Sequence, residues 1–382
     1  MRVELPILFS ASSFALTPFG LMMALGCAAG LAHCAAAGGR RALFAALCAA
    51  VGAVFVGHAV WGLVWVDFDV TGLEAYTDGA PGWTFLLQPW LGGSCLYGAL
   101  AGGLLGAWLW RLSRRGDRPG FLDLLDRLAP GACAALVLGR AAEVFNGQGV
   151  GEFIENEAFQ FFPLCVCTYA DEEFSTWQVC VWFWEAAAAL ALLAALVILR
   201  GKRRLPEGRL AGVFLLVLSA SQIFLEQLRK DDALKFGFVI SFTQIAAAVT
   251  IAAVLTVRLI RARGPGGWDI LRLLTAASGF CAVIFAEFVF DKPQFYLPLR
   301  IAMAATALSG AVLLIGAHRR LLWLRIIGAT ALAGLSGWTA VRLGAMETDV
   351  ETIVTYAIIF GAMLVTGAAA LNTGRTGRKT AL

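Results

Sequence analysis

The chain has 382 residues, of which 59% are hydrophobic and only 15% are charged, and its formal net charge is +4. With a mean hydropathy of +0.77, this composition excludes a soluble globular domain and predicts an integral membrane protein. The basic residues lie in short clusters between apolar segments, so the net charge does not indicate nucleic-acid binding.

Apolar segments that are long enough to cross a bilayer recur along the whole chain, and a span takes about 20 helical residues. Basic clusters follow alternate segments, and the remaining loops are acidic or poor in charge. By the positive-inside rule, this pattern places the N-terminus outside and the C-terminus in the cytoplasm. We therefore predict an all-α polytopic membrane protein. Its eleven segments run at 7–37, 42–66, 84–110, 121–145, 176–199, 209–230, 233–257, 270–290, 297–317, 321–343 and 350–371.

The first segment contains Leu31-Ala-His-Cys34, which faintly resembles a lipoprotein cleavage box. Almost no positive charge precedes it, whereas Arg40 and Arg41 follow it. That charge pattern is typical of a first membrane helix and not of a signal peptide.

Glycines surround a tyrosine near the start of the third segment: Gly92 and Gly93 precede Tyr97, and Gly98 follows it. Glycine lets the backbone approach either a neighbouring helix or a lipid head group, and small residues are common in membrane helix packing. Because a charged segment follows, we expect these residues to contribute to a shared site.

The fourth segment carries Arg140 and Glu143 near its far end. The two side chains are three residues apart, so they share one face of a helix. A charge at the centre of a membrane helix costs about 2.5–3.5 kcal/mol on the insertion scale. Either an ion pair with a neighbouring helix or the binding of an anionic lipid head group offsets this cost. Asn146, Gln148 and Gly151 follow at the outer end.

Polar residues also lie along one face of the sixth segment. Gln222, Glu226 and Arg229 are spaced by four and then three residues, which keeps them aligned on a helix. They are candidates for substrate binding. The alternative for Glu226 and Arg229 is a salt bridge between near neighbours at the membrane interface.

The nine cysteines and three histidines do not form a cluster that predicts a metal site, and we expect no cofactor. His58 is interpreted as a hydrogen-bonded core residue. Cys165 and Cys167 lie in an outer loop, where pairing with Cys180 or Cys95 stays open.

These motifs resemble those of the bacterial prolipoprotein diacylglyceryl transferases. The fourth segment is similar to the family signature, in which an Asp and a Pro precede Gly-Arg and Asn-Gly. The matching residues are Asp126, Pro130, Gly139, Arg140, Asn146, Gly147 and Gly151. The chain departs from the family at Ala142, Glu143 and Gln148, where Gly, Asn and Glu are usual, and at Tyr97 and Gln222, where His and Arg are usual.

The resemblance implies a seven-helix core in residues 1–263, multi-pass in the bacterial plasma membrane. The apolar segments after it predict a four-helix extension in 264–382, which the family core lacks. It implies transfer of a diacylglyceryl group from phosphatidylglycerol, or another anionic phospholipid, to the lipobox cysteine of exported lipoprotein precursors. The alternative is a catalytically altered or inactive homologue that acts as a lipid-binding accessory protein. The catalytic candidates are Tyr97, Arg140 and Glu143, and the substrate-binding candidates are Gly92, Gly93, Gly98, Asn146, Gln148, Gly151, Gln222, Glu226 and Arg229.

Overall fold

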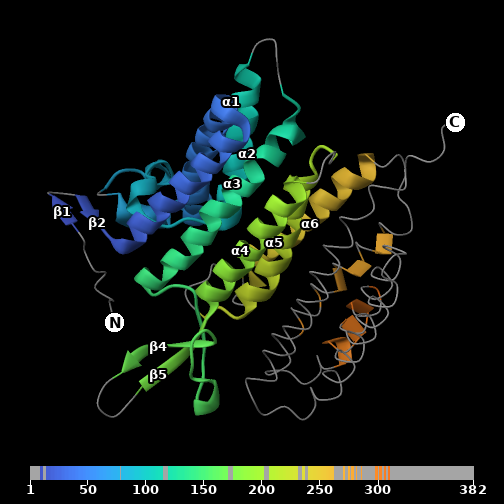
Figure 1. Cartoon of the computed structure of the whole chain (residues 1–382). Coiled ribbons are helices and arrows are strands. Elements are labelled where there is room, and N and C mark those ends of the chain that lie inside the picture. Colours follow the sequence, from blue (N-terminus) through green and yellow to red (C-terminus); the bar gives the residue numbers. More distant parts are fainter. Residues whose placement is uncertain are drawn as a thin grey trace. The chain divides into compact units, whose positions relative to one another are not determined.

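Helices dominate the computed structural model of this chain, as the sequence predicts (Figure 1). The chain divides into two compact units, one of Met1–Phe214 with Arg229–Ala246 and one of Leu215–Leu228 with Ala247–Leu382. The boundary expected at 263 and most of the predicted extension lie outside the described residues. The structure describes residues 9–11, 14–77, 79–114, 119–170, 175–201, 206–230, 235–236, 240–261 and scattered positions from 270 to 309.

The longest helix, α1, spans Pro18–Trp65 and is interrupted at Gly39, whose φ of 65° and ψ of −160° are not helical. Its two halves correspond to the first two predicted segments. Among the described helices, α1 and α4 (Val181–Arg200) are long and apolar enough to cross a membrane. The other α-helices are α2 (Leu96–Ser113), α3 (Phe121–Ala142), α5 (Arg209–Gln227) and α6 (Phe242–Arg261). The short 3₁₀ helices are η1 (Val70–Tyr76), η2 (Gly82–Leu87), η3 (Pro89–Leu91), η4 (Glu143–Asn146) and η5 (Glu157–Phe159).

Short antiparallel strands correct the prediction of a purely helical fold. Within the described part of the chain they form three sheets, with the orders β1-β2, β3-β5-β4 and β6-β7. Three predicted helices therefore begin late, because their first residues pair as strands. An apolar run alone does not distinguish a strand from a helix, and β5 contains the β-branched and aromatic residues that favour strands. The strands are β1 (Phe9–Ala11), β2 (Phe14–Leu16), β3 (Val150–Phe153), β4 (Cys165–Ala170), β5 (Ser175–Cys180), β6 (Lys235–Phe236) and β7 (Ile240–Ser241).

Helices α1 and α2 pack through glycines that bring their backbones into contact. A Cβ atom added to Gly102 would lie 2.1 Å from the carbonyl oxygen of Gly52, and one added to Gly106 would lie 2.1 Å from that of Cys48. Small residues at such interfaces allow the close approach that drives helix association in membranes.

The carboxylate of Asp126 joins α3 to the first turn of α5. Its Oδ2 accepts a hydrogen bond of 2.8 Å from the Gly208 amide, and its Oδ1 accepts one of 2.8 Å from the Ala211 amide. The first amides of a helix have no partner within the helix. Asp126 therefore caps α5 from a different helix, which explains why an acidic residue is placed near the start of α3.

We predict that Gly102→Ala destabilises the protein by about 3 kcal/mol or more, because the methyl group overlaps the backbone of α1. Gly103→Ala is the matched control, since the nearest atom to its Cβ would be 3.7 Å away. Thermal unfolding in detergent measures both variants, and equal melting temperatures would contradict the packing assignment.

We predict that Asp126→Ala costs about 1–3 kcal/mol, because two partly buried amides lose a charged acceptor. Asp123→Ala on the same helix is the control. Its exposed pair with Arg127 is worth about 0.5 kcal/mol or less. Equilibrium unfolding in mixed detergent measures the difference, and a loss at Asp126 no larger than that at Asp123 argues against the cap.

Candidate functional site

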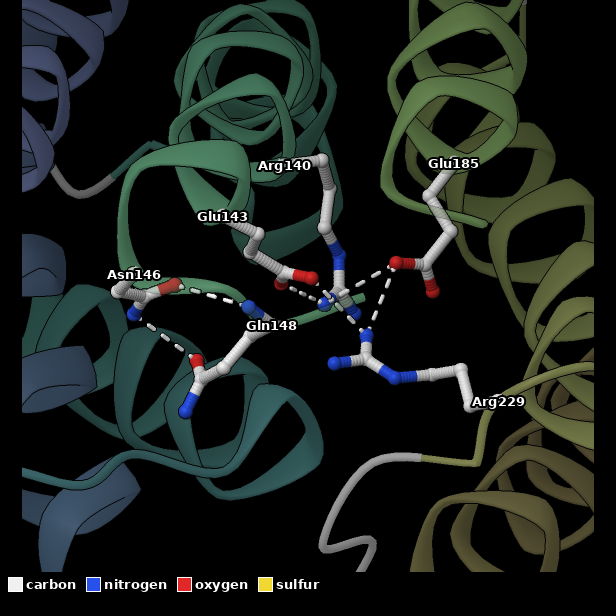
Figure 2. Close-up of polar contacts among 6 residues, drawn as sticks. All are labelled: Arg140, Glu143, Asn146, Gln148, Glu185 and Arg229. Carbon is white, nitrogen blue, oxygen red and sulfur yellow. Dashed lines mark hydrogen bonds and ion pairs between the residues drawn. The ribbon is translucent and has the colours of Figure 1, made fainter. Parts of the chain in front are cut away.

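Four charged side chains from separate elements meet in the first compact unit, and we call them the charge quartet. Arg140 is on α3, Glu143 begins η4, Glu185 is on α4, and Arg229 follows α5. Figure 2 shows that the two guanidinium groups and the two carboxylates point toward one another.

Each arginine of the quartet contacts both glutamates. Arg140 Nη1 donates to Glu143 Oε1 and lies 3.4 Å from Glu185 Oε2. Arg229 Nη1 donates to Glu185 Oε2 at 3.0 Å and lies 3.2 Å from Glu143 Oε2. Arg140 and Glu143, which are predicted to share one helical face, contact each other, and Arg140 also forms the alternative ion pair with a neighbouring helix, through Glu185 of α4. For Arg229, the structure gives partners on two other elements.

The quartet is nearly removed from solvent. The Glu185 side chain is 0% exposed, the Glu143 and Arg229 side chains are 11% exposed, and that of Arg140 is 13% exposed. Two positive and two negative charges sum to zero, so the cluster carries no formal net charge. Removing one partner from a buried ion pair leaves an uncompensated charge, so the four side chains depend on one another.

A glycine beside the quartet makes room for Glu143. Gly149 has a φ of +70°, which is in the left-handed region that favours glycine. A Cβ atom there would lie 2.6 Å from Glu143 Oε2 and 2.7 Å from Trp182 Cβ. The Trp182 amide donates to the Gly149 carbonyl at 2.8 Å, so the loop after η4 is fixed against the start of α4.

The backbone of Gly151 positions Arg229. These two residues form an isolated antiparallel β-bridge, and the Lys230 amide donates to the Val150 carbonyl at 3.0 Å. Gln178 Nε2 donates to the Gly151 carbonyl at 3.1 Å. Gly151 therefore acts through its backbone, which helps to position Arg229 in the quartet.

Asn146 and Gln148 lie at the edge of the quartet and contact each other (Figure 2). Asn146 Nδ2 donates to Gln148 Oε1 at 3.1 Å, and the Gln148 amide donates to the Glu143 carbonyl at 3.1 Å. Gln148 is exposed and Asn146 is half-buried.

The predicted glycines of the third segment lie where α1 meets α2. A Cβ on Gly98 would lie 2.8 Å from Val60 Cβ, and one on Gly93 would lie 2.4 Å from the Trp61 ring. These two glycines serve packing against α1. Gly92 is exposed, with nothing within 4 Å of an added Cβ. Tyr97 is buried in the first turn of α2.

His58 is a hydrogen-bonded core residue, as the sequence predicts. Its ring nitrogens lie 3.2 Å from the Gly93 carbonyl oxygen and 2.8 Å from the Phe85 carbonyl oxygen, and the residue is buried. It therefore ties α1 to the loop that leads into α2.

Gln222 and Glu226 lie on α5 in the second compact unit, and both are buried. They remain candidate substrate-binding residues. Within the described residues, no three His, Cys, Asp or Glu side chains are grouped to hold a metal ion.

Seven of the described cysteines are free thiols: Cys27, Cys34, Cys48, Cys133, Cys165, Cys180 and Cys281. Cys165 and Cys180, for which pairing was left open, are buried. Burial raises the pKa of the Cys165 thiol above its ordinary value. A raised pKa keeps this thiol protonated and unreactive at neutral pH.

Sequence reasoning missed Glu185 as the common partner of both arginines. The available signal was a single carboxylate in the otherwise apolar helix α4. An ionisable residue within a membrane helix is a functional candidate by default, so this rule would have selected it.

A helical protein with a buried charge cluster at the ends of apolar helices is typical of membrane enzymes and transporters. Residues 6–260 match the prolipoprotein diacylglyceryl transferase family. The chain therefore belongs to this family, whose members are transferases.

Curated relatives are similar to this chain at low identity. A phosphatidylglycerol–prolipoprotein diacylglyceryl transferase of Prochlorococcus marinus is 26% identical over 254 residues, which cover 59% of this chain and 79% of the relative. The enzyme of the same name from Parasynechococcus marenigrum is 31% identical, over 44% of this chain and 62% of the relative. The enzyme of the same name from Frankia alni is 28% identical, over 46% of this chain and 45% of the relative. The matches to the last two thus span less than two thirds of those relatives.

We predict that Glu185→Gln destabilises the protein by about 3–5 kcal/mol, because two buried guanidinium groups lose their shared carboxylate. The control is Glu152→Gln, which removes an exposed ion pair with Lys230 worth about 0–1 kcal/mol. Thermal unfolding in detergent compares them. A Glu185→Gln variant as stable as the control would show that the quartet does not hold the helices together.

Proposed function

We propose that this protein transfers a diacylglyceryl group from phosphatidylglycerol to the lipobox cysteine thiol of exported lipoprotein precursors. The observation that supports this proposal most directly is the pair of guanidinium groups, Arg140 and Arg229, held together by buried carboxylates. The curated relatives carry the name of this reaction.

The phosphate of the lipid requires cationic donors. A guanidinium fork binds phosphate oxygens through two parallel hydrogen bonds, which a lysine does not. In the reaction, the bond between the diacylglyceryl carbon and a phosphate oxygen breaks and a carbon–sulfur bond forms. The leaving group is glycerol phosphate, and donors that stabilise its developing charge lower the barrier. Arg140 and Arg229 supply these donors.

The incoming cysteine must lose its proton, because the thiolate is the nucleophile. Glu143 and Tyr97 are the candidate acceptors. Glu143 is favoured by its place in the quartet, where it contacts both arginines. Tyr97 takes the family's histidine position in the third segment.

The protein is proposed to be a multi-pass plasma-membrane protein with its N-terminus outside. The quartet lies at the C-terminal end of α3 and near the start of α4, whereas Arg200 and Arg111 lie at the far ends of α4 and α2. Under the positive-inside rule, the arginine-rich ends are cytoplasmic and the quartet is near the outer surface. Exported precursors and outer-leaflet lipids are then on the quartet's side. The exposed or half-buried candidates Gly92, Asn146 and Gln148 are proposed to meet the lipid.

We predict that Arg140→Ala lowers the rate of transfer by at least about 100-fold, the usual cost of one lost transition-state donor. Tyr97→Phe in the same assay lowers the rate sharply if its hydroxyl moves the proton. The assay is diacylglyceryl labelling of a lipobox peptide by purified protein and phosphatidylglycerol. The matched control is Arg127→Gln, an exposed cation at the other end of α3, which leaves the rate unchanged.

Absence of labelling by the wild type, under conditions in which an established family member works, ends the enzyme proposal. If the wild type then still binds phosphatidylglycerol, the accessory lipid-binding role is supported in its place.

A further inference from the structure

The two carboxylates of the quartet are not equivalent. Glu185 has no exposed side-chain surface, and its Oε2 is shared by the two arginines at 3.4 Å and 3.0 Å. Glu143 is also buried, with 11% of its side-chain surface exposed, and its two oxygens contact different arginines: Oε1 contacts Arg140 and Oε2 contacts Arg229. Glu185 therefore contacts both cations through Oε2, whereas Glu143 bridges them with its two different oxygens.

This bridging contact is also the one that a phosphate would make. A phosphodiester presents two unesterified oxygens, and two guanidinium groups bind such oxygens through charge-assisted hydrogen bonds. Glu143 and a phosphate would use the same Nη1 donors of Arg140 and Arg229. A phosphate that bridges the two Nη1 groups in the way Glu143 does would therefore compete with Glu143 for them.

The position of Glu143 permits such a displacement. It is the first residue of η4, just beyond the last residue of α3, and the turn that follows contains Gly147 and Gly149 with positive φ. Its side chain can leave the arginines by rotating about its own bonds. Glu185, within α4 and fully buried, has no comparable freedom.

We infer that Glu143 occupies the phosphate position in the unliganded protein and that the lipid phosphate displaces it. This inference rests on the proposed function. The net charge of the site indicates which class of ligand it binds. Without Glu143, the two arginines and Glu185 carry one net positive charge. That charge matches a phosphodiester with a single negative charge, such as phosphatidylglycerol, whereas a phosphomonoester brings up to two. The charge that remains after Glu143 is displaced thus favours a lipid phosphodiester, and the displaced Glu143 carboxylate is free to accept the thiol proton.

The test uses calorimetry to measure how tightly short-chain phosphatidylglycerol binds to the purified protein in detergent micelles. Glu143→Gln removes the competing charge and keeps the shape of the side chain. We expect it to bind phosphatidylglycerol about tenfold more tightly. This gain corresponds to a phosphate site that Glu143 leaves vacant about one tenth of the time in the wild type. Glu152→Gln, an exposed carboxylate in the adjoining strand that pairs with Lys230, is the control and binds as the wild type does.

Two results overturn the inference. One is unchanged or weaker binding of phosphatidylglycerol by a folded Glu143→Gln protein. The other is wild-type affinity for short-chain phosphatidic acid, a phosphomonoester, that equals or exceeds the affinity for phosphatidylglycerol.

A measurement on the wild type covers the case in which the variant does not fold. Carbodiimide labelling of the Glu143 carboxylate, followed by mass spectrometry, should rise when phosphatidylglycerol is added, while Glu185 stays unlabelled. Labelling that does not rise contradicts displacement. Arg140→Ala separates the two proposals. If this variant keeps full binding, the proposed function fails. If it loses binding but Glu143→Gln gains none, only the displacement fails.

Discussion

The carboxylate of Glu185 is shut off from solvent, and its charge is tolerated there because two guanidinium groups reach it. One comes from α3, and the other comes from the segment after α5. Since a buried charge without a partner is strongly destabilising, this contact holds three parts of the chain in one geometry. The same contact concentrates two cations at one point, which is the chemical requirement for recognising a phosphate.

Several contacts outside the quartet hold the helices and the loop that carry its side chains. Asp126 fixes the start of α3 to the first turn of α5, and Arg140 fixes its other end in the quartet. Glycine contacts pack α1 closely against α2. The backbone bridge between Gly151 and Arg229 positions the second arginine. The residues that match the family signature therefore have two kinds of role. Some, such as Asp126, connect helices, and others, such as Arg140, belong to the charge quartet.

The residues that depart from the family pattern acquire a physical meaning in this arrangement. Glu143 adds a second carboxylate, which balances the two arginines and makes the quartet neutral without a ligand. A neutral, closed cluster is less costly to keep among apolar helices than an open pair of cations. The departure at Glu143 is thus compatible with phosphate binding, provided that the carboxylate can be displaced.

The sequence by itself determined the features that depend on local periodicity. Apolar runs predicted the helices, and the three-residue spacing of Arg140 and Glu143 predicted that they share a face, because 3.6 residues per turn fixes which side chains lie together. Only the tertiary structure decided that Arg229 meets Glu185 across 44 residues of sequence and that Gly98 packs on α1. It also decided that residues 175–180 form a strand. Such contacts depend on how helices pack and on which backbone groups find partners, and neither is encoded in the spacing of residues along one segment.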